Sequence, residues 1–189
     1  MADSNKIKYG LKSVYYSKAT IATDGSATYT TPVQLPGAVS LSLDPQGDTG
    51  KFYADNIAYY VSVANNGYEG SLELAKVPET FLKDILGYDT GANGVLYEDA
   101  GAKPAHFALL FQFEGDQSAK RHVFYNCVAA RPATAGQTKE ESIEPQTESI
   151  DITASSVYAL SKDIIKGSAN EGDAAYSTWF TTVALPTST

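Results

Sequence analysis

The chain has 189 residues, of which 43% are apolar, so it is long enough and apolar enough to bury a core in a single domain and is not a disordered chain. Its net charge of −8 argues against tight binding to phosphate backbones, which needs clustered Lys and Arg, and no basic run is longer than Lys120-Arg121. The single Cys127 excludes an intramolecular disulfide. No apolar run approaches the ~18 residues of a membrane helix, and the N-terminus lacks the apolar segment of a signal peptide, so we expect a soluble protein of a reducing cytoplasm.

The N-terminal part is predicted to contain strands separated by a long loop. Residues 1–10 are polar and are expected to form an N-terminal arm, and residues 11–19 have the pattern of a strand. Residues 20–37 carry an Asp24-Gly25 turn signal and two prolines, which predict a long, partly extended loop. A half-buried strand is expected over residues 38–43, followed by a turn over residues 44–48.

A hairpin is predicted around Asn66-Gly67, because both central residues of a type I′ turn need positive φ and these residue types tolerate it best. This turn would pair Val61 with Leu72 and Tyr59 with Leu74 on an apolar core face. The opposite, polar face would carry Tyr60, Ser62, Glu69, Ser71 and Glu73.

One short helix is predicted over about residues 78–86. Pro78 suits the first helical position, Glu79 favours the positive end of the helix dipole, and Gly87 is a typical terminator. The apolar side chains fall on one face, which must dock on a sheet because so short a helix is not stable alone: Phe81, Leu82, Ile85 and Leu86.

The second half is predicted to alternate strands and loops. Residues 88–104 form a glycine-rich loop, and residues 106–113 a strand with one wholly apolar face. Residues 120–131 are apolar on both faces, which favours a central or covered strand. Residues 132–147 are expected to form a second long loop with an acidic cluster, which is interpreted as solvated or as an intersubunit contact: Glu140, Glu141, Glu144 and Glu148.

The last third is predicted to end in a C-terminal segment, residues 173–189. Residues 148–153 and 157–166 are expected to be strands. Asp173 could cap a helical turn that carries Tyr176, Trp179 and Phe180. The predicted fold class is therefore mainly β, an antiparallel sandwich or barrel with one docked α-helix and long loops, in one domain spanning residues 1–189.

No catalytic, cofactor-binding or metal-binding residues are predicted. Gly47-Asp48-Thr49-Gly50-Lys51 lacks the spacing of a phosphate-binding loop. His106 and His122 lie on neighbouring strands but have too few further ligands for a metal site, so both are interpreted as ordinary strand histidines. The Asp44 and Asp48 pair does not match a calcium loop and is better explained by turn chemistry.

Several strings, taken in order, carry a resemblance to a known family. They are Leu35-Pro36-Gly37-Ala38-Val39-Ser40-Leu41, Phe52-Tyr53-Ala54-Asp55-Asn56 with Tyr59-Tyr60, Gly67-Tyr68-Glu69-Gly70, Phe81-Leu82-Lys83-Asp84-Ile85-Leu86-Gly87, Phe107-Ala108-Leu109, Arg121-His122-Val123-Phe124-Tyr125-Asn126-Cys127, Arg131-Pro132 and Trp179-Phe180. Together they resemble the major tail proteins (tail tube proteins) of long-tailed phages of Gram-positive bacteria, the phi13 type. The matches cover roughly residues 35–132 and a short part near the C-terminus.

The resemblance implies a structural virion protein with the phage tail tube fold and no enzymatic role or cofactor. Such subunits assemble in the host cytoplasm as six-subunit rings, which stack into a hollow tube around a tape measure protein. Tail terminator and distal tail proteins are further expected partners. Phage DNA would pass through the lumen without specific binding, and no membrane partner is expected.

Residues 20–37 or 44–51 are the candidates for a loop that joins one ring to the next. An acidic lumen is predicted, because DNA slides along a like-charged wall without being trapped. The polar face of the predicted hairpin is a candidate surface for this lumen or for subunit contacts. Two alternatives stay open at this stage. One is a β-sandwich carbohydrate-binding module with tyrosines as stacking platforms, and the other is the inner tube of a phage-derived bacteriocin or secretion device.

Overall fold

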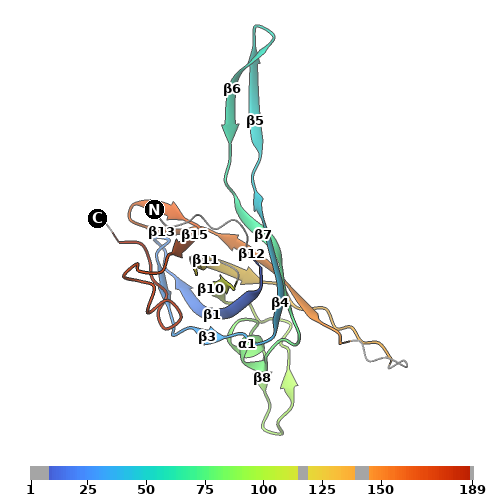
Figure 1. Ribbon diagram of the computed structural model, residues 1–189. Coiled ribbons are helices and arrows are strands. Elements are labelled where there is room, and N and C mark those ends of the chain that lie inside the picture. The colour runs from blue at the N-terminus through green and yellow to red at the C-terminus, as the bar shows by residue number, and fades with distance from the viewer. Residues whose placement is uncertain (1–8, 115–118, 139–144, 188–189) are drawn as a thin grey trace.

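The structure is a computed structural model, and it describes residues 9–114, 119–138 and 145–187 (Figure 1). A curled, mainly antiparallel β body carries one short helix, and a long hairpin projects from it. The elements are β1 (Leu11–Ile21), β2 (Ala27–Tyr29), β3 (Val33–Gln34), β4 (Ala38–Gln46), β5 (Thr49–Ala54), β6 (Ile57–Val63), β7 (Gly67–Leu74), α1 (Glu79–Asp84), β8 (Asp89–Thr90), β9 (Leu96–Tyr97), β10 (His106–Phe113), β11 (Arg121–Ala129), β12 (Glu148–Ser155), β13 (Val157–Ala159), β14 (Lys162–Ile164) and β15 (Lys166–Ala169).

The main sheet has the strand order β2-β1-β10-β11-β12-β7-β4, with β15 paired to β11 and β3 paired to β1. The sheet curls so that β4 returns close to β1 and encloses the core. The predicted mainly β class with one docked helix is therefore confirmed.

The centre of the sheet is the β10–β11 hairpin, as its apolar pattern predicts. Phe107, Leu109 and Phe111 are buried on one face of β10, and Leu110 is buried on the other. β11 is bordered by β10 on one edge and by β12 and β15 along the other. Both of its faces are apolar because each packs into a different core, Phe124 and Cys127 into the main one and Val123 and Tyr125 into a smaller one.

Helix α1 closes one side of the main core. Phe81 and Ile85 are fully buried, and the Phe81 ring meets Tyr16 and Phe107 edge to face at 5.1 and 5.6 Å. The helix is shorter than predicted at both ends, because Pro78 is extended (φ −65°, ψ 141°) as the N-cap and Ile85 is already the C-cap. Gly87 follows the helix with φ 75°, the left-handed conformation that the sequence indicates for a helix end.

A second, smaller core lies under the C-terminal segment. Residues 173–182 form successive tight turns and not the expected helical turn, although Trp179 is buried as an anchor. The Arg121 guanidinium lies 3.8 Å from the Tyr176 ring centroid and 4.7 Å from that of Phe180, and it donates to the Tyr176 carbonyl oxygen. These contacts fasten the segment to the start of β11.

The predicted hairpin at Asn66-Gly67 is wrong. β6 pairs with β5, and β7 pairs with β4 and β12, so Val61 and Tyr59 do not face Leu72 and Leu74. Asp55 and Asn56 form the turn instead, with φ of 52° and 63°, as a type I′ turn requires. Leu72 and Leu74 are fully buried, whereas Val61 is 50% and Tyr59 71% exposed.

The predicted turn over residues 44–48 is wrong for the same reason. β4 continues through Pro45 to Gln46, which is paired with Gly67. The chain then runs out along β5 to the turn at Asp55-Asn56 and returns along β6. Pro45 is tolerated because β4 lies at the edge of the sheet.

The stretches expected as loops contain short strands. Residues 20–37 hold β2 and β3, which pair with β1, and residues 88–104 hold the small β8–β9 hairpin. β13 and β14 form a hairpin in the stretch predicted as strand over residues 157–166. The described parts of residues 132–147 are irregular, and Glu140, Glu141 and Glu144 lie outside the described residues.

Candidate assembly surfaces

Within the described residues, the projecting hairpin, residues 49–63, concentrates exposed apolar side chains on a ribbon that stands away from the body (Figure 1). At ~3.3 Å per residue, the ribbon reaches roughly 30 Å from Gln46 to its turn. Its large apolar side chains are all at least half exposed: Phe52, Tyr53, Ile57, Tyr59, Tyr60, Val61 and Val63. A two-stranded ribbon of this kind is marginally stable alone in water, and an apolar surface of this size is typical of a protein contact.

Both faces of the projecting hairpin are apolar. Phe52 is paired with Tyr60, and residues paired across a ladder share a face. The other face carries Tyr53 and Val61, with Lys51 paired beside Val61. The alternation therefore does not separate a core face from a solvent face, which is the arrangement expected of a ribbon that partners cover from two sides.

Glycines at the base let the ribbon pass close to its neighbours. A Cβ atom on Gly67 (φ 99°) would lie 2.1 Å from the Ala154 carbonyl oxygen, and one on Gly47 would lie 2.0 Å from that of Ala64. Side chains at these positions would push apart the strands from which the projecting hairpin starts.

The outward face of β4, β7 and β12 forms a second surface, which we call the acidic face. The strand registers align its residues in three rows, Asp44-Glu69-Thr153, Ser42-Ser71-Asp151 and Ser40-Glu73-Ser149. Every side chain in these rows is a hydroxyl or a carboxylate, and none is basic. The surface is therefore uniformly negative or neutral and offers a phosphate backbone no cation.

Two side-chain hydrogen bonds hold the Glu73 carboxylate of the acidic face. Its oxygens accept hydrogen bonds from Thr147 Oγ1 at 2.5 Å and from Ser40 Oγ at 2.8 Å. These two hydrogen bonds, that of Thr147 first, lower the pKa of Glu73, so the face keeps this charge at neutral pH.

The prediction of a polar face on the hairpin is partly right. Glu69, Ser71 and Glu73 lie together on β7 with the acidic face, whereas Tyr60 and Ser62 belong to the projecting hairpin. Sequence reasoning missed the exposed ribbon that carries Phe52, Tyr53 and Ile57. The signal that could have found them is Asp55-Asn56, a turn dipeptide flanked on both sides by Tyr, Phe and Ile.

The two histidines, which were weighed as metal ligands, lie apart in the structure. His106 Nδ1 lies 2.6 Å from Asn126 Oδ1, whereas His122 stacks on Phe111 toward the other end of the β10–β11 ladder, at 5.3 Å between ring centroids. Across residues 9–114, 119–138 and 145–187, no three His, Cys, Asp or Glu side chains are grouped to hold a metal ion.

The acidic and thiol candidates have local explanations. Asp44 lies on the acidic face opposite Glu69, and the Asp48 carbonyl oxygen accepts from the Ala64 N–H at the base of the projecting hairpin. Glu148 Oε2 accepts from the Val77 N–H at 2.6 Å, just before α1. Cys127 is fully buried, and this desolvation raises the pKa of its thiol.

No helix in the described part of the chain has the length and hydrophobicity needed to cross a bilayer.

Comparison with known proteins gives one family. The sequence model of the family described as phage tail tube protein matches residues 2–181, nearly the whole chain. No match is found among curated proteins.

Proposed function

Because the chain belongs to the phage tail tube protein family, a family of structural tail subunits that self-assemble into a tube, we propose that it polymerises as stacked hexameric rings. The rings form the hollow tail tube that conducts phage DNA during genome ejection. The observation that carries this proposal is the projecting hairpin, whose two apolar faces are exposed in the single chain and need partners.

The projecting hairpin is the contact between subunits, within or between rings. Its base includes residues 47–51, part of the 44–51 stretch proposed from the sequence as the inter-ring loop. The other candidate, residues 20–37, is less suited, because its strands pair with β1 and its Leu35 and Ala27 are buried in the body.

The acidic face lines the lumen. Asp44, Glu69 and Asp151 give it negative charge without a neighbouring basic side chain in its rows. DNA passing along such a wall is repelled weakly everywhere and held nowhere, since phosphate binding needs Lys or Arg contacts. The unpaired edge of β4 lies beside this face and is available for edge-to-edge contact with the sheet of the next subunit.

The same architecture accounts for the remaining partners and for the site of action. The tube encloses a tape measure protein during assembly, and tail terminator and distal tail proteins bind its two ends. The subunit is a component of the virion tail, assembles in the cytoplasm of the host bacterium, and acts without catalysis or cofactor. An inner tube of a bacteriocin or secretion device would use the same surfaces, and the genes that neighbour this one distinguish that case.

A variant without the projecting hairpin tests the proposal. Gln46 and Gly67 are directly paired, so residues 47–66 can be replaced by a two-residue Asn-Gly turn that joins β4 to β7. Negative-stain electron microscopy should show rings or tubes for the wild-type protein and monomers for the variant. Circular dichroism should show that the body of the variant keeps its β structure. Normal tubes from the variant would refute the role of the hairpin, and a wild-type protein that stays monomeric and binds glycans would favour a carbohydrate-binding module.

A further inference from the structure

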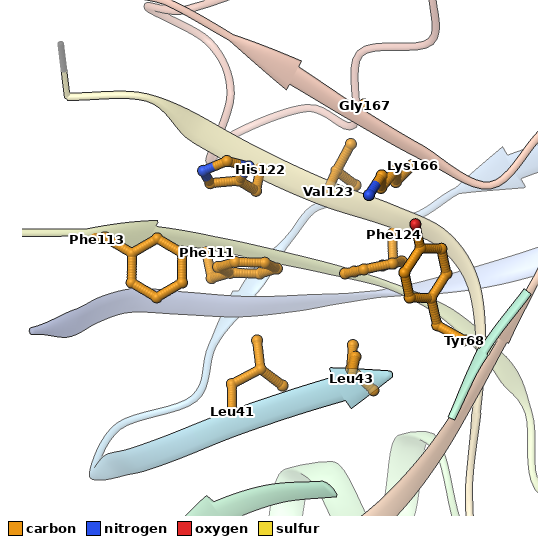
Figure 2. Close-up of a pocket in the computed structure, with 10 residues that line it drawn as sticks. All are labelled: Leu41, Leu43, Tyr68, Phe111, Phe113, His122, Val123, Phe124, Lys166 and Gly167. Atoms are coloured by element: carbon orange, nitrogen blue, oxygen red, sulfur yellow. The ribbon is translucent and has the colours of Figure 1, made fainter. Parts of the chain in front are cut away.

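An apolar groove opens at the edge of the body, where β4 lies across from β10, β11 and β15 (Figure 2). Its volume is about 260 Å³. It is lined by Leu41, Leu43, Tyr68, Phe111, Phe113, His122, Val123, Phe124, Lys166 and Gly167. Small-molecule sites typically measure ~300–1,000 Å³, so this groove is better matched in size to a few protein side chains.

Aromatic rings form the floor of the groove. Phe111 stacks on His122 and Phe124, with ring centroids 5.3 and 6.2 Å apart, and Tyr68 meets Phe124 edge to face at 5.1 Å. Leu41 and Leu43 face these rings from β4 (Figure 2) and are only partly buried. The groove is thus an edge of the main core, in which Phe111 and Phe124 are buried whereas Leu41, Leu43 and Tyr68 are only partly buried.

The rim of the groove is positively charged. Lys166 Nζ lies 4.7 Å from the Tyr68 ring centroid, and the residues that line the groove include no carboxylate. An occupant that combines apolar side chains with a nearby carboxylate would therefore fit both the floor and the rim.

The projecting hairpin has this combination at its tip. Phe52 is paired with Tyr60, and Ala54 with Ile57, which places the Phe52 and Ile57 side chains on the same face of the ribbon. Asp55 is the first residue of the turn beside them. Phe52 and Ile57 are each 62% exposed in the single chain.

A chain cannot place its own tip in its own groove. The projecting hairpin starts beside the groove, where Leu43 and Tyr68 lie near its base, and it extends away from the body (Figure 1). Two different patches that complement each other only between copies make a heterologous contact, which propagates into rings or filaments unless two copies exchange their hairpins reciprocally.

We infer that the apolar groove of one subunit receives the tip of the projecting hairpin of another copy. Phe52 and Ile57 cover the aromatic floor, and the Asp55 carboxylate pairs with Lys166. This inference rests on the proposed function, since it names the surface to which the projecting hairpin binds in the tube.

Site-specific disulfide cross-linking tests the contact. Ile57→Cys combined with Leu43→Cys should give a ladder of covalent oligomers when assembled tubes are oxidised and analysed without reductant. Cys127 contributes no background because it is fully buried. The matched control is Ile57→Cys with Val95→Cys, since Val95 is 55% exposed but lies on the turn between β8 and β9, and it should give no ladder.

Charge exchange tests the ion pair independently. Asp55→Lys or Lys166→Glu alone should raise the protein concentration needed for assembly by about tenfold, and the double variant should restore it. Tubes that form normally but give no Ile57–Leu43 ladder and no charge rescue would overturn the groove contact and leave the proposed function standing. A wild-type protein that forms no tubes would overturn both.

Discussion

The β body and the projecting hairpin are built from the same kinds of residue but use them differently. In the body, Leu72 and Leu74 on β7 alternate with Ser71 and Glu73, and the apolar side chains are fully buried. In the projecting hairpin, tyrosines, phenylalanine and valines occupy both faces, and all remain exposed. The comparison shows that apolar content alone does not reveal whether a strand is buried within its own chain or between chains.

The largest expected difference between the two regions is the stability cost of removing an aromatic ring. Phe81→Ala should lower the free energy of unfolding by about 3–5 kcal/mol, because it leaves a cavity under α1. Phe52→Ala should change it by less than about 0.5 kcal/mol, because that ring contacts mainly solvent in the single chain. Urea denaturation of the dilute, unassembled protein measures both, and equal costs would mean that the projecting hairpin folds back on the body.

A second comparison concerns the glycines at the base of the projecting hairpin and elsewhere. Gly67→Ala should destabilise the body by about 2–4 kcal/mol, because the added Cβ meets the Ala154 carbonyl oxygen in addition to the strain of positive φ. Gly94→Ala is the control, since Gly94 has a similar φ of 82° but nothing within 4 Å of its Cβ position, and it should cost only about 1 kcal/mol. Thermal melts of the two variants measure the difference. Equal shifts in Tm would show that the contact between Gly67 and the Ala154 carbonyl oxygen is not tight.

A third effect should appear at alkaline pH. Burial, followed by the hydrogen bond to Asp84, raises the pKa of Tyr16 from 10 to about 12. The folded-state pKa is the higher one, so the stability from this group is complete below pH 10 and is lost as the pH rises toward 12.

Tyr16→Phe should therefore cost about 1 kcal/mol at neutral pH, for the lost hydrogen bond, and should lose less stability than the wild type between pH 10 and 12. Tyr59→Phe on the projecting hairpin is the control, because this ring is largely exposed. Urea denaturation as a function of pH measures the difference, and parallel curves for Tyr16→Phe and the wild type would contradict the buried hydroxyl.

The smallest effect is expected on the acidic face. The hydrogen bonds from Thr147 and Ser40 lower the pKa of Glu73 from its usual 4.5, so its contribution to stability is present above that pH and is lost as the pH falls through the folded-state value. Glu73→Gln should be slightly less stable than the wild type at neutral pH, and the two should converge in acid. A difference that persists or grows in acid would show that the carboxylate is not held by these hydrogen bonds.

Local sequence pattern was sufficient for several single elements of the body and insufficient for the strand pairing and for the projecting hairpin. The apolar faces of β10 and β11, the helix between Pro78 and Gly87, and the alternation in β12 each follow from a short stretch of residues. The pairing of β7 with β4 and β12 does not, because it depends on contacts far along the chain.

The register error has a specific cause. Asp55-Asn56 and Asn66-Gly67 are both suitable type I′ turn dipeptides, and choosing the second moves Val61 and Tyr59 into a core they do not occupy. For the acidic face, β7 alone could be predicted. The flanking carboxylates Asp44 and Asp151 come beside it only through the long-range strand order.

A three-dimensional electron microscopy map of tubes assembled from the purified protein tests the central claim most directly. The account predicts that Glu69 and Asp151 of the acidic face line the lumen and that each projecting hairpin lies against another subunit. A lumen lined by basic side chains, or an acidic face on the outer wall with the projecting hairpins free in solvent, would contradict it.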